Sequence, residues 1–121
     1  MNDKVRGFFA FGEMGMDLAE RRKKLNDKLI DEPRAEIDSI DSELLWLLNS
    51  RAEVALRVGA MKTIYDLPLG DADRESEILT RLAGENRGPF CQEAIVNIFR
   101  RIIDESRKLQ EETYLKASEP D

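Results

Sequence analysis

Two cationic side chains, Arg51 and Lys62, occupy a face of a predicted helix where apolar residues are expected. They are eleven residues apart. At about 100° per residue, eleven residues turn roughly 20° past three full turns, so both side chains project from one face. Ala55 and Val58 lie between them on that face. Cations on a core-facing stripe are costly to bury without partners, and a small anionic ligand would satisfy them.

A second polar pair interrupts a later apolar stripe. Ser106 and Gln110 are four residues apart in a segment whose other inward positions are apolar. Those positions are Ile95, Ile98, Phe99, Ile102, Ile103 and Leu109. A buried hydroxyl or amide needs a hydrogen-bond partner, so this pair also points to a site that takes a polar ligand.

The composition narrows the chemistry. The chain has 121 residues, no histidine and a formal net charge of −6. This acidity argues against nucleic acid as a partner, but a few focused cations can still bind a small anion. Without histidine, the commonest general base and metal ligand is missing, and we expect neither a metal nor a cofactor. The single cysteine, Cys91, fits a reducing compartment, and no apolar run reaches the length of a membrane span. We therefore expect a cytoplasmic protein.

Hydrophobic periodicity predicts an all-α domain with one long N-terminal helix. Apolar residues recur at helical spacing over residues 34–65, and Pro68 is expected to end this helix. A helix of about 30 residues is roughly 45 Å long, which is more than so small a domain can cover. The run Leu44–Leu48 is apolar all round. We therefore predict a homodimer in which two long helices pack against each other.

The segment before this helix is predicted to be an N-terminal extension over residues 1–30, flexible or partly helical. Within it, residues 17–30 are polar and helix-prone. Pro33 is interpreted as a break or a first turn, with Asp31 or Glu32 as the cap. This proline could reorient the first turn of the long helix.

The rest of the chain is predicted to complete the functional domain, which spans residues 31–116. Two further helices are expected over residues 72–85, with Asp71 as the N-cap, and over residues 91–115. Residues 117–121 are predicted to be a polar C-terminal tail.

The polar groups together resemble one known family, the all-helical chorismate mutases. The stretches that carry the resemblance are Arg34-Ala-Glu-Ile-Asp-Ser-Ile-Asp-Ser-Glu-Leu-Leu, Leu48-Asn-Ser-Arg51-Ala-Glu, Val58-Gly-Ala-Met-Lys62, Asp71-Ala-Asp-Arg74-Glu75 and Phe99-Arg-Arg-Ile-Ile-Asp-Glu-Ser106-Arg-Lys-Leu-Gln110. The resemblance implies a three-helix chorismate-mutase fold assembled as an intertwined homodimer. It also implies isomerisation of chorismate to prephenate, in the branch of the shikimate pathway that leads to phenylalanine and tyrosine.

The resemblance further implies a role for each polar residue. Arg34 reaches into the partner protomer's site to meet one substrate carboxylate, and Arg51 binds the other. Lys62 and Gln110 donate to the ether oxygen of the breaking bond, so Arg51, Lys62 and Gln110 are the candidate catalytic residues. The remaining expected contacts are Asp71 and Glu75 with the ring hydroxyl, Arg74 with a carboxylate and neighbouring acids, Ser106 with a carboxylate, and Ala55, Val58, Ile78 and Ile103 as the pocket lining. Pro33 directly precedes Arg34 and is expected to influence how far that arginine reaches.

The reaction fits a chain without histidine. A [3,3] rearrangement moves no proton and needs no covalent intermediate, so the enzyme must orient a flexible dianion and stabilise charge on the ether oxygen. Gln110 carries an amide, which donates a hydrogen bond at any ordinary pH. We therefore expect an activity that depends little on acidification.

Three alternatives stay open at this stage. An isochorismate pyruvate lyase shares the fold, although Asp71 and the Arg74-Glu75 pair resemble the mutase pattern more closely. A non-catalytic helical module could serve dimerisation or regulate a partner enzyme of the aromatic pathway, although a degenerate module should have lost some of the cations. The third is a helical dimer whose charges are simply solvated, which is the usual state of any one surface arginine or lysine.

Overall fold

The structure is a computed structural model that describes residues 15–115. Its elements are the helices α2 (Leu18–Ile64), α3 (Ala72–Glu85) and α4 (Gln92–Gln110), followed by a π-helical turn, η1 (Glu111–Leu115). Residues 15–115 contain no strand, which agrees with the predicted all-α class. Across the same residues, no helix is both long and apolar enough to cross a membrane. The chain forms two compact units, residues 1–44 and 45–121, and the expectations for residues 1–14 and 117–121 lie outside the described residues.

The long helix begins earlier than the sequence predicted. Asp17 Oδ1 accepts a hydrogen bond from the backbone N–H of Glu20 at 2.8 Å, which is the bond made by an N-cap residue. The helix-prone segment over residues 17–30 is thus helical from Leu18 onward.

The prediction that Pro33 breaks or starts a helix is wrong, because α2 continues through it. Proline already holds a helical φ, and its missing N–H deprives a single carbonyl, that of Leu29, of its usual partner. Leu29 is exposed, so water can satisfy that carbonyl. Asp31 and Glu32 are therefore not caps, and Arg34 lies in the interior of α2 rather than in a first turn.

The C-terminal end of α2 lies close to the predicted position, at Ile64. The N–H of Leu67 donates to the carbonyl of Lys62 at 2.7 Å, and the N–H of Asp66 donates to that of Thr63 at 3.3 Å. Asp66 has a φ of 54°, the left-handed conformation that ends many helices. These two bonds form a Schellman motif, which fixes the backbone of Lys62 in the last turn.

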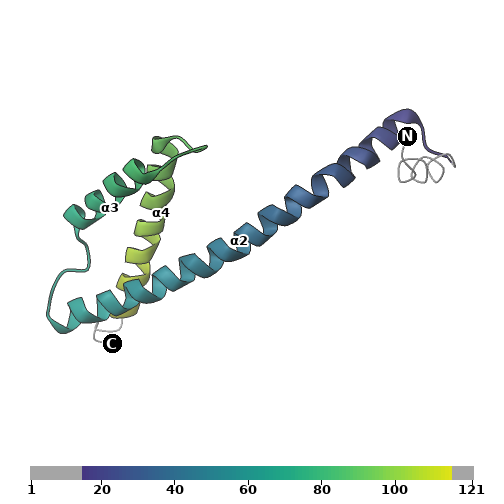
Figure 1. Cartoon of the computed structure of the whole chain (residues 1–121). Helices are drawn as coiled ribbons and strands as arrows, with labels where there is room; N and C mark the ends of the chain where they lie inside the picture. The colour runs from purple at the N-terminus through teal and green to yellow at the C-terminus, as the bar shows by residue number, and fades with distance from the viewer. Residues whose placement is uncertain (1–14, 116–121) are drawn as a thin grey trace. The chain divides into compact units, whose positions relative to one another are not determined.

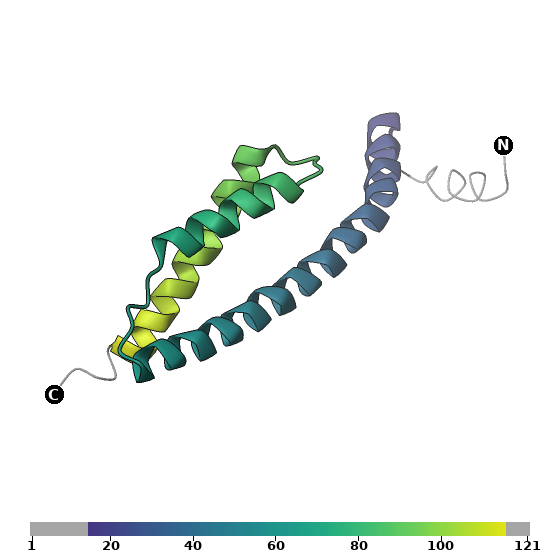
Figure 2. The ribbon, with the colours of Figure 1, turned by 60° about the vertical axis from the view of Figure 1, so that its left-hand side comes forward.

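The second unit is built from the end of α2 together with α3 and α4. Figures 1 and 2 both show α3 beside α4, with the C-terminal end of α4 next to the last turns of α2. The bounds of α3 match the predicted 72–85. The segment predicted as one helix over residues 91–115 is instead an α-helix to Gln110 and a π-helical turn after it.

Apolar side chains of α2 are unusually exposed in the single chain. The exposed residues from the middle of the helix are Ile37, Ile40, Leu44, Leu45, Trp46, Leu47 and Leu48. Among residues 15–115, Ile103 is the one apolar side chain that is buried. Apolar surface on this scale marks an interaction surface.

Candidate active site

A cavity of about 300 Å³ lies among α2, α3 and α4 in the second unit. Its lining consists of Arg51, Val54, Ala55, Val58, Lys62, Leu69, Asp71, Arg74, Glu75, Ile78, Ile103, Ser106, Arg107 and Gln110. Every site residue predicted from the sequence is among them except Arg34, which lies on α2 and is exposed.

A larger hollow of about 750 Å³ lies over α3 and α4, and it shares only Glu75 and Ile103 with the smaller cavity. It lacks Arg51, Lys62 and Gln110. The predicted polar groups therefore gather around the smaller cavity.

A short chain of hydrogen bonds orients Arg51. Its Nη1 donates to Ser106 Oγ at 3.1 Å, and Ser106 Oγ donates in turn to the carbonyl of Ile102 at 2.8 Å. The serine thus bonds back to its own helix and also accepts from an arginine 55 residues away. Both side chains are half-buried and line the cavity, and the guanidinium has further N–H groups that can bind a ligand.

Lys62 projects from the last turn of α2, which the Schellman motif holds. Its Nζ donates to the carbonyl of Leu69 at 3.1 Å, across the loop between α2 and α3. An ammonium group has three N–H bonds, so two remain for a ligand in the cavity. The half-buried side chain leaves this charge only partly screened by water.

Gln110 is one of the most enclosed residues described, with 8% of its surface exposed. Its Nε2 donates to the carbonyl of Ala55 at 2.7 Å, which joins the end of α4 to α2. The amide nitrogen carries two hydrogens. One is held by Ala55, and the other is free to donate to a ligand in the cavity.

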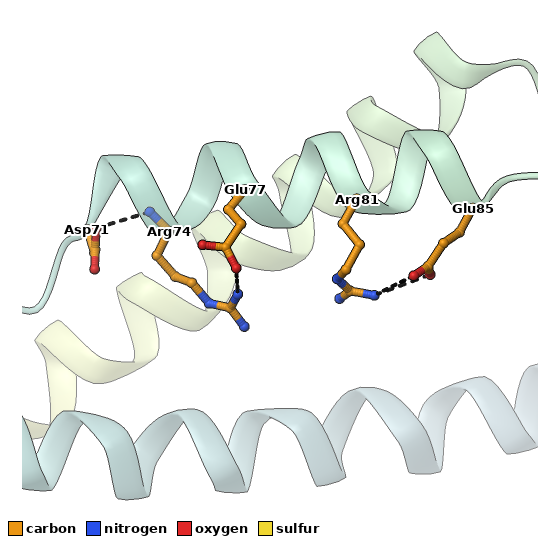
Figure 3. Close-up of polar contacts among 5 residues, drawn as sticks. All are labelled: Asp71, Arg74, Glu77, Arg81 and Glu85. Atoms are coloured by element: carbon orange, nitrogen blue, oxygen red, sulfur yellow. Dashed lines mark hydrogen bonds and ion pairs between the residues drawn. The ribbon is translucent and has the colours of Figure 1, made fainter.

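The start of α3 supplies the remaining charges. Asp71 caps the helix as predicted, because its Oδ1 accepts from the backbone N–H of Arg74 at 3.0 Å. The Arg74 guanidinium pairs with Glu77 at 2.7 Å, and both side chains are more than half exposed. Figure 3 shows this pair beside a second one, Arg81 with Glu85, along the same side of α3.

Sequence reasoning missed Arg107, which lines the cavity and forms an ion pair with Glu75. The side chains are 34% and 27% exposed, so this pair is less solvated than the others. A signal was present, because Arg107 follows the buried Ile103 by four residues and precedes Gln110 by three, which places all three on one helix face. Val54 and Leu69 are the other lining residues that the sequence did not predict.

The charges around the cavity do not balance. Four cationic and two acidic side chains line it, which leaves an excess of two positive charges. Three of the cations, Arg51, Lys62 and Arg107, are half-buried, where charge interactions are stronger than in bulk water. A small molecule with two negative charges and a hydrogen-bond acceptor between them matches this lining.

Comparison with known proteins identifies the family of the chain. Residues 33–111 match the family model described as chorismate mutase type II. The match covers more than half of the chain, and the protein belongs to that family. The family suggested by the sequence and the all-helical fold are therefore confirmed.

Several curated relatives are bifunctional proteins. The bifunctional chorismate mutase/prephenate dehydratase of Aquifex aeolicus is 42% identical over 85 residues, which are 67% of this chain and 24% of that protein. The protein of the same name from Escherichia coli K12 is 35% identical over 74 residues, 60% of this chain and 19% of the relative. The T-protein of Haemophilus influenzae is 37% identical over 75 residues, which are 60% of this chain and 20% of that protein. The chain spans about a quarter or less of the length of these relatives.

Solved structures show the same fold. Form II of the chorismate mutase from Thermus thermophilus has a TM-score of 0.67 and 38% identity, over 68% of this chain and 93% of that one. Form I of the same enzyme has a TM-score of 0.63 and 38% identity, over 64% of this chain and 96% of that one.

Proposed function

We propose that the chain is a chorismate mutase, which isomerises chorismate to prephenate by a [3,3] rearrangement. One observation carries the proposal: the helical second unit contains a cavity with an excess of two positive charges and with donors from α2 and α4. Chorismate carries two carboxylates and an ether oxygen, so its charge and its acceptor both match this lining.

The first task of the site is to hold the substrate in a compact conformation. Arg51, oriented by Ser106, binds one carboxylate through the planar fork of its guanidinium. Asp71 and Glu75 hold the ring hydroxyl, and Arg74 acts on a carboxylate at the edge of the cavity. Fixing the dianion in this shape brings the two carbon atoms that form the new bond together, which lowers the barrier through orientation.

The second task is to stabilise the charge that develops as the C–O bond breaks. In one step that bond breaks and the C–C bond forms, while negative charge builds up on the ether oxygen. The free hydrogens of Lys62 Nζ and Gln110 Nε2 donate to that oxygen from α2 and α4. Donors preset for the transition state favour it over the ground state, and no proton needs to move.

A second copy of the chain completes this site in our proposal. Arg34 lies on α2 outside the second unit, and we propose that it enters the cavity of a partner protomer to meet the other carboxylate. The exposed apolar residues of α2, with Trp46 at 69% exposure, support a homodimer built on this helix. Burying such surface is favourable by about 25 cal/mol per Å².

We also propose that the protein acts in the cytoplasm, where its one cysteine stays reduced. Several of the relatives are named as joining chorismate mutase to prephenate dehydratase, which supports a functional link to another enzyme of the aromatic pathway.

The test follows the absorbance of chorismate with purified protein and identifies the product as prephenate. Lys62→Ala should abolish most of the turnover, and Lys108→Ala, at an exposed position, serves as the matched control. Release of salicylate and pyruvate from isochorismate, with no turnover of chorismate, would instead identify a lyase. A folded protein that turns over neither substrate would identify a non-catalytic module.

A further inference from the structure

Tyr114 contacts the same part of α2 as the proposed donor Gln110. Its Oη donates to the carbonyl of Leu56 at 2.6 Å. The adjacent carbonyl, that of Ala55, accepts from Gln110 Nε2 at 2.7 Å. Two neighbouring carbonyls of α2 therefore receive hydrogen bonds from two side chains of the C-terminal segment, although Tyr114 itself does not line the cavity.

Gly59 provides the space for this contact. A Cβ at Gly59 would lie 2.8 Å from Cε2 of Tyr114 and 3.2 Å from Cγ of Gln110, whereas carbon atoms pack best at about 3.5–4.0 Å. Gly59 is the one buried residue in α2. A glycine inside a helix costs about 0.5–1 kcal/mol relative to alanine, and here the close approach of both side chains accounts for it.

The winding of the chain changes between the two side chains. The α-helix ends at Gln110, and the π-helical turn η1 covers Glu111–Leu115. In an α-helix, residues four apart are offset by about 40° around the axis. A π-helical turn is wider, with i→i+5 bonds, so it reduces this offset and turns Tyr114 toward the side of Gln110.

We propose that Tyr114 is a positioning residue for Gln110. By holding the C-terminal segment against Gly59, it keeps the Gln110 amide bonded to Ala55, so that the second hydrogen of the amide points into the cavity. The inference rests on the proposed function, in which that hydrogen meets the ether oxygen. Because this contact matters mainly in the transition state, loss of the positioning lowers kcat and leaves KM in place.

The first experiment compares Tyr114→Phe with Tyr65→Phe. Tyr114→Phe keeps the ring and removes only the bond to Leu56, and Tyr65 is an exposed tyrosine with 74% exposure. For Tyr114→Phe we expect kcat to fall about three- to tenfold, the worth of one hydrogen bond, with KM within about twofold of the parent protein. Tyr65→Phe should leave both constants unchanged. The inference is overturned if kcat is unchanged, or if KM rises while kcat stays the same.

The second experiment repeats Tyr114→Phe in a Gln110→Ala background. A residue that acts through Gln110 has no further effect on kcat once that amide is gone, whereas a general structural role lowers kcat by the same factor in both backgrounds. The latter result overturns the inference.

A third measurement does not depend on turnover. The side-chain amide signals of Gln110 in an ¹⁵N NMR spectrum should shift in Tyr114→Phe and stay in place in Tyr65→Phe. If the parent protein does not isomerise chorismate, the proposed function fails, and the NMR comparison still decides whether Tyr114 positions the amide. Signals that do not move in Tyr114→Phe overturn the inference.

Discussion

Replacing Arg107 with leucine tests how the cavity balances its charges. Arg107 pairs with Glu75, and both line the cavity. Leucine keeps apolar volume near the helix but removes the cation, so Glu75 becomes an unpaired carboxylate in a cavity that is proposed to bind a dianion. The excess of positive charge around the cavity falls from two to one.

The size of the effect follows from how far the pair is buried. Exposed ion pairs contribute about 0–1 kcal/mol, and removing one partner of a fully buried pair costs about 3–5 kcal/mol. With side chains 34% and 27% exposed, this pair lies between those limits, and about 1–2 kcal/mol is a reasonable cost for substrate binding. That corresponds to a rise in KM of about 5- to 30-fold.

The assay measures kcat and KM for chorismate in Arg107→Leu and in a matched control, Arg101→Leu. Arg101 forms an ion pair with Glu105 on the same helix, with side chains 78% and 52% exposed, and its loss should leave KM within about twofold. Adding Glu75→Gln to Arg107→Leu removes the unpaired charge but keeps a side-chain oxygen that can accept from the ring hydroxyl, so it should restore most of the lost affinity.

Two results would refute this reasoning. If KM in Arg107→Leu matches that of the parent protein, the pair does not control the charge of the cavity. If the double variant with Glu75→Gln binds substrate worse than Arg107→Leu alone, the two side chains act independently, and repulsion by an unpaired carboxylate is not the cause.

Three further predictions concern the donors and the dimer. Lys62→Ala should fold normally and lose about 10²–10³-fold in kcat, as expected for removal of one preset donor. A rise in KM with no change in kcat would contradict the role of donor. Gln110→Glu should gain activity as the pH falls, because a carboxyl group donates only when protonated, whereas the parent protein should be nearly flat with pH; parallel pH profiles would contradict this. Leu44→Asp should shift the sedimentation coefficient from that of a dimer to that of a monomer, because the introduced aspartate places a charge on an apolar interface. The control Asp41→Asn should remain a dimer. If Leu44→Asp also remains a dimer, this part of α2 is not the interface.

Much of the second unit could be predicted because local signals agreed with one another. The bounds of α3 follow from an N-cap aspartate and an apolar stripe that includes Ile78. Arg51 and Lys62 were expected on one face from spacing alone, and both line the cavity with Gln110. Such spacing fixes the direction of a side chain on its helix, but it does not fix the hydrogen bonds that the side chain makes.

Other features could not be predicted for physical reasons. Pro33 looked like a boundary because proline is costly inside a helix, but only one exposed carbonyl loses its partner, and α2 continues. Arg107 was not among the predicted site residues, because its partner Glu75 comes from another helix. The π-helical turn at Glu111–Leu115 has no sequence signature comparable to a cap, and the bond of Tyr114 to Leu56 joins residues that are far apart in the sequence.

The local excess of positive charge at the cavity has a consequence for how the ligand arrives. The chain as a whole carries −6, so a dianion is repelled by much of the surface and attracted chiefly at the mouth of the cavity. Such a field guides encounter but reaches only about 10 Å at 0.1 M ionic strength. Added salt therefore weakens this long-range attraction more than it weakens the contacts within the cavity. The association rate constant of the ligand should fall with ionic strength more steeply than its dissociation rate constant rises.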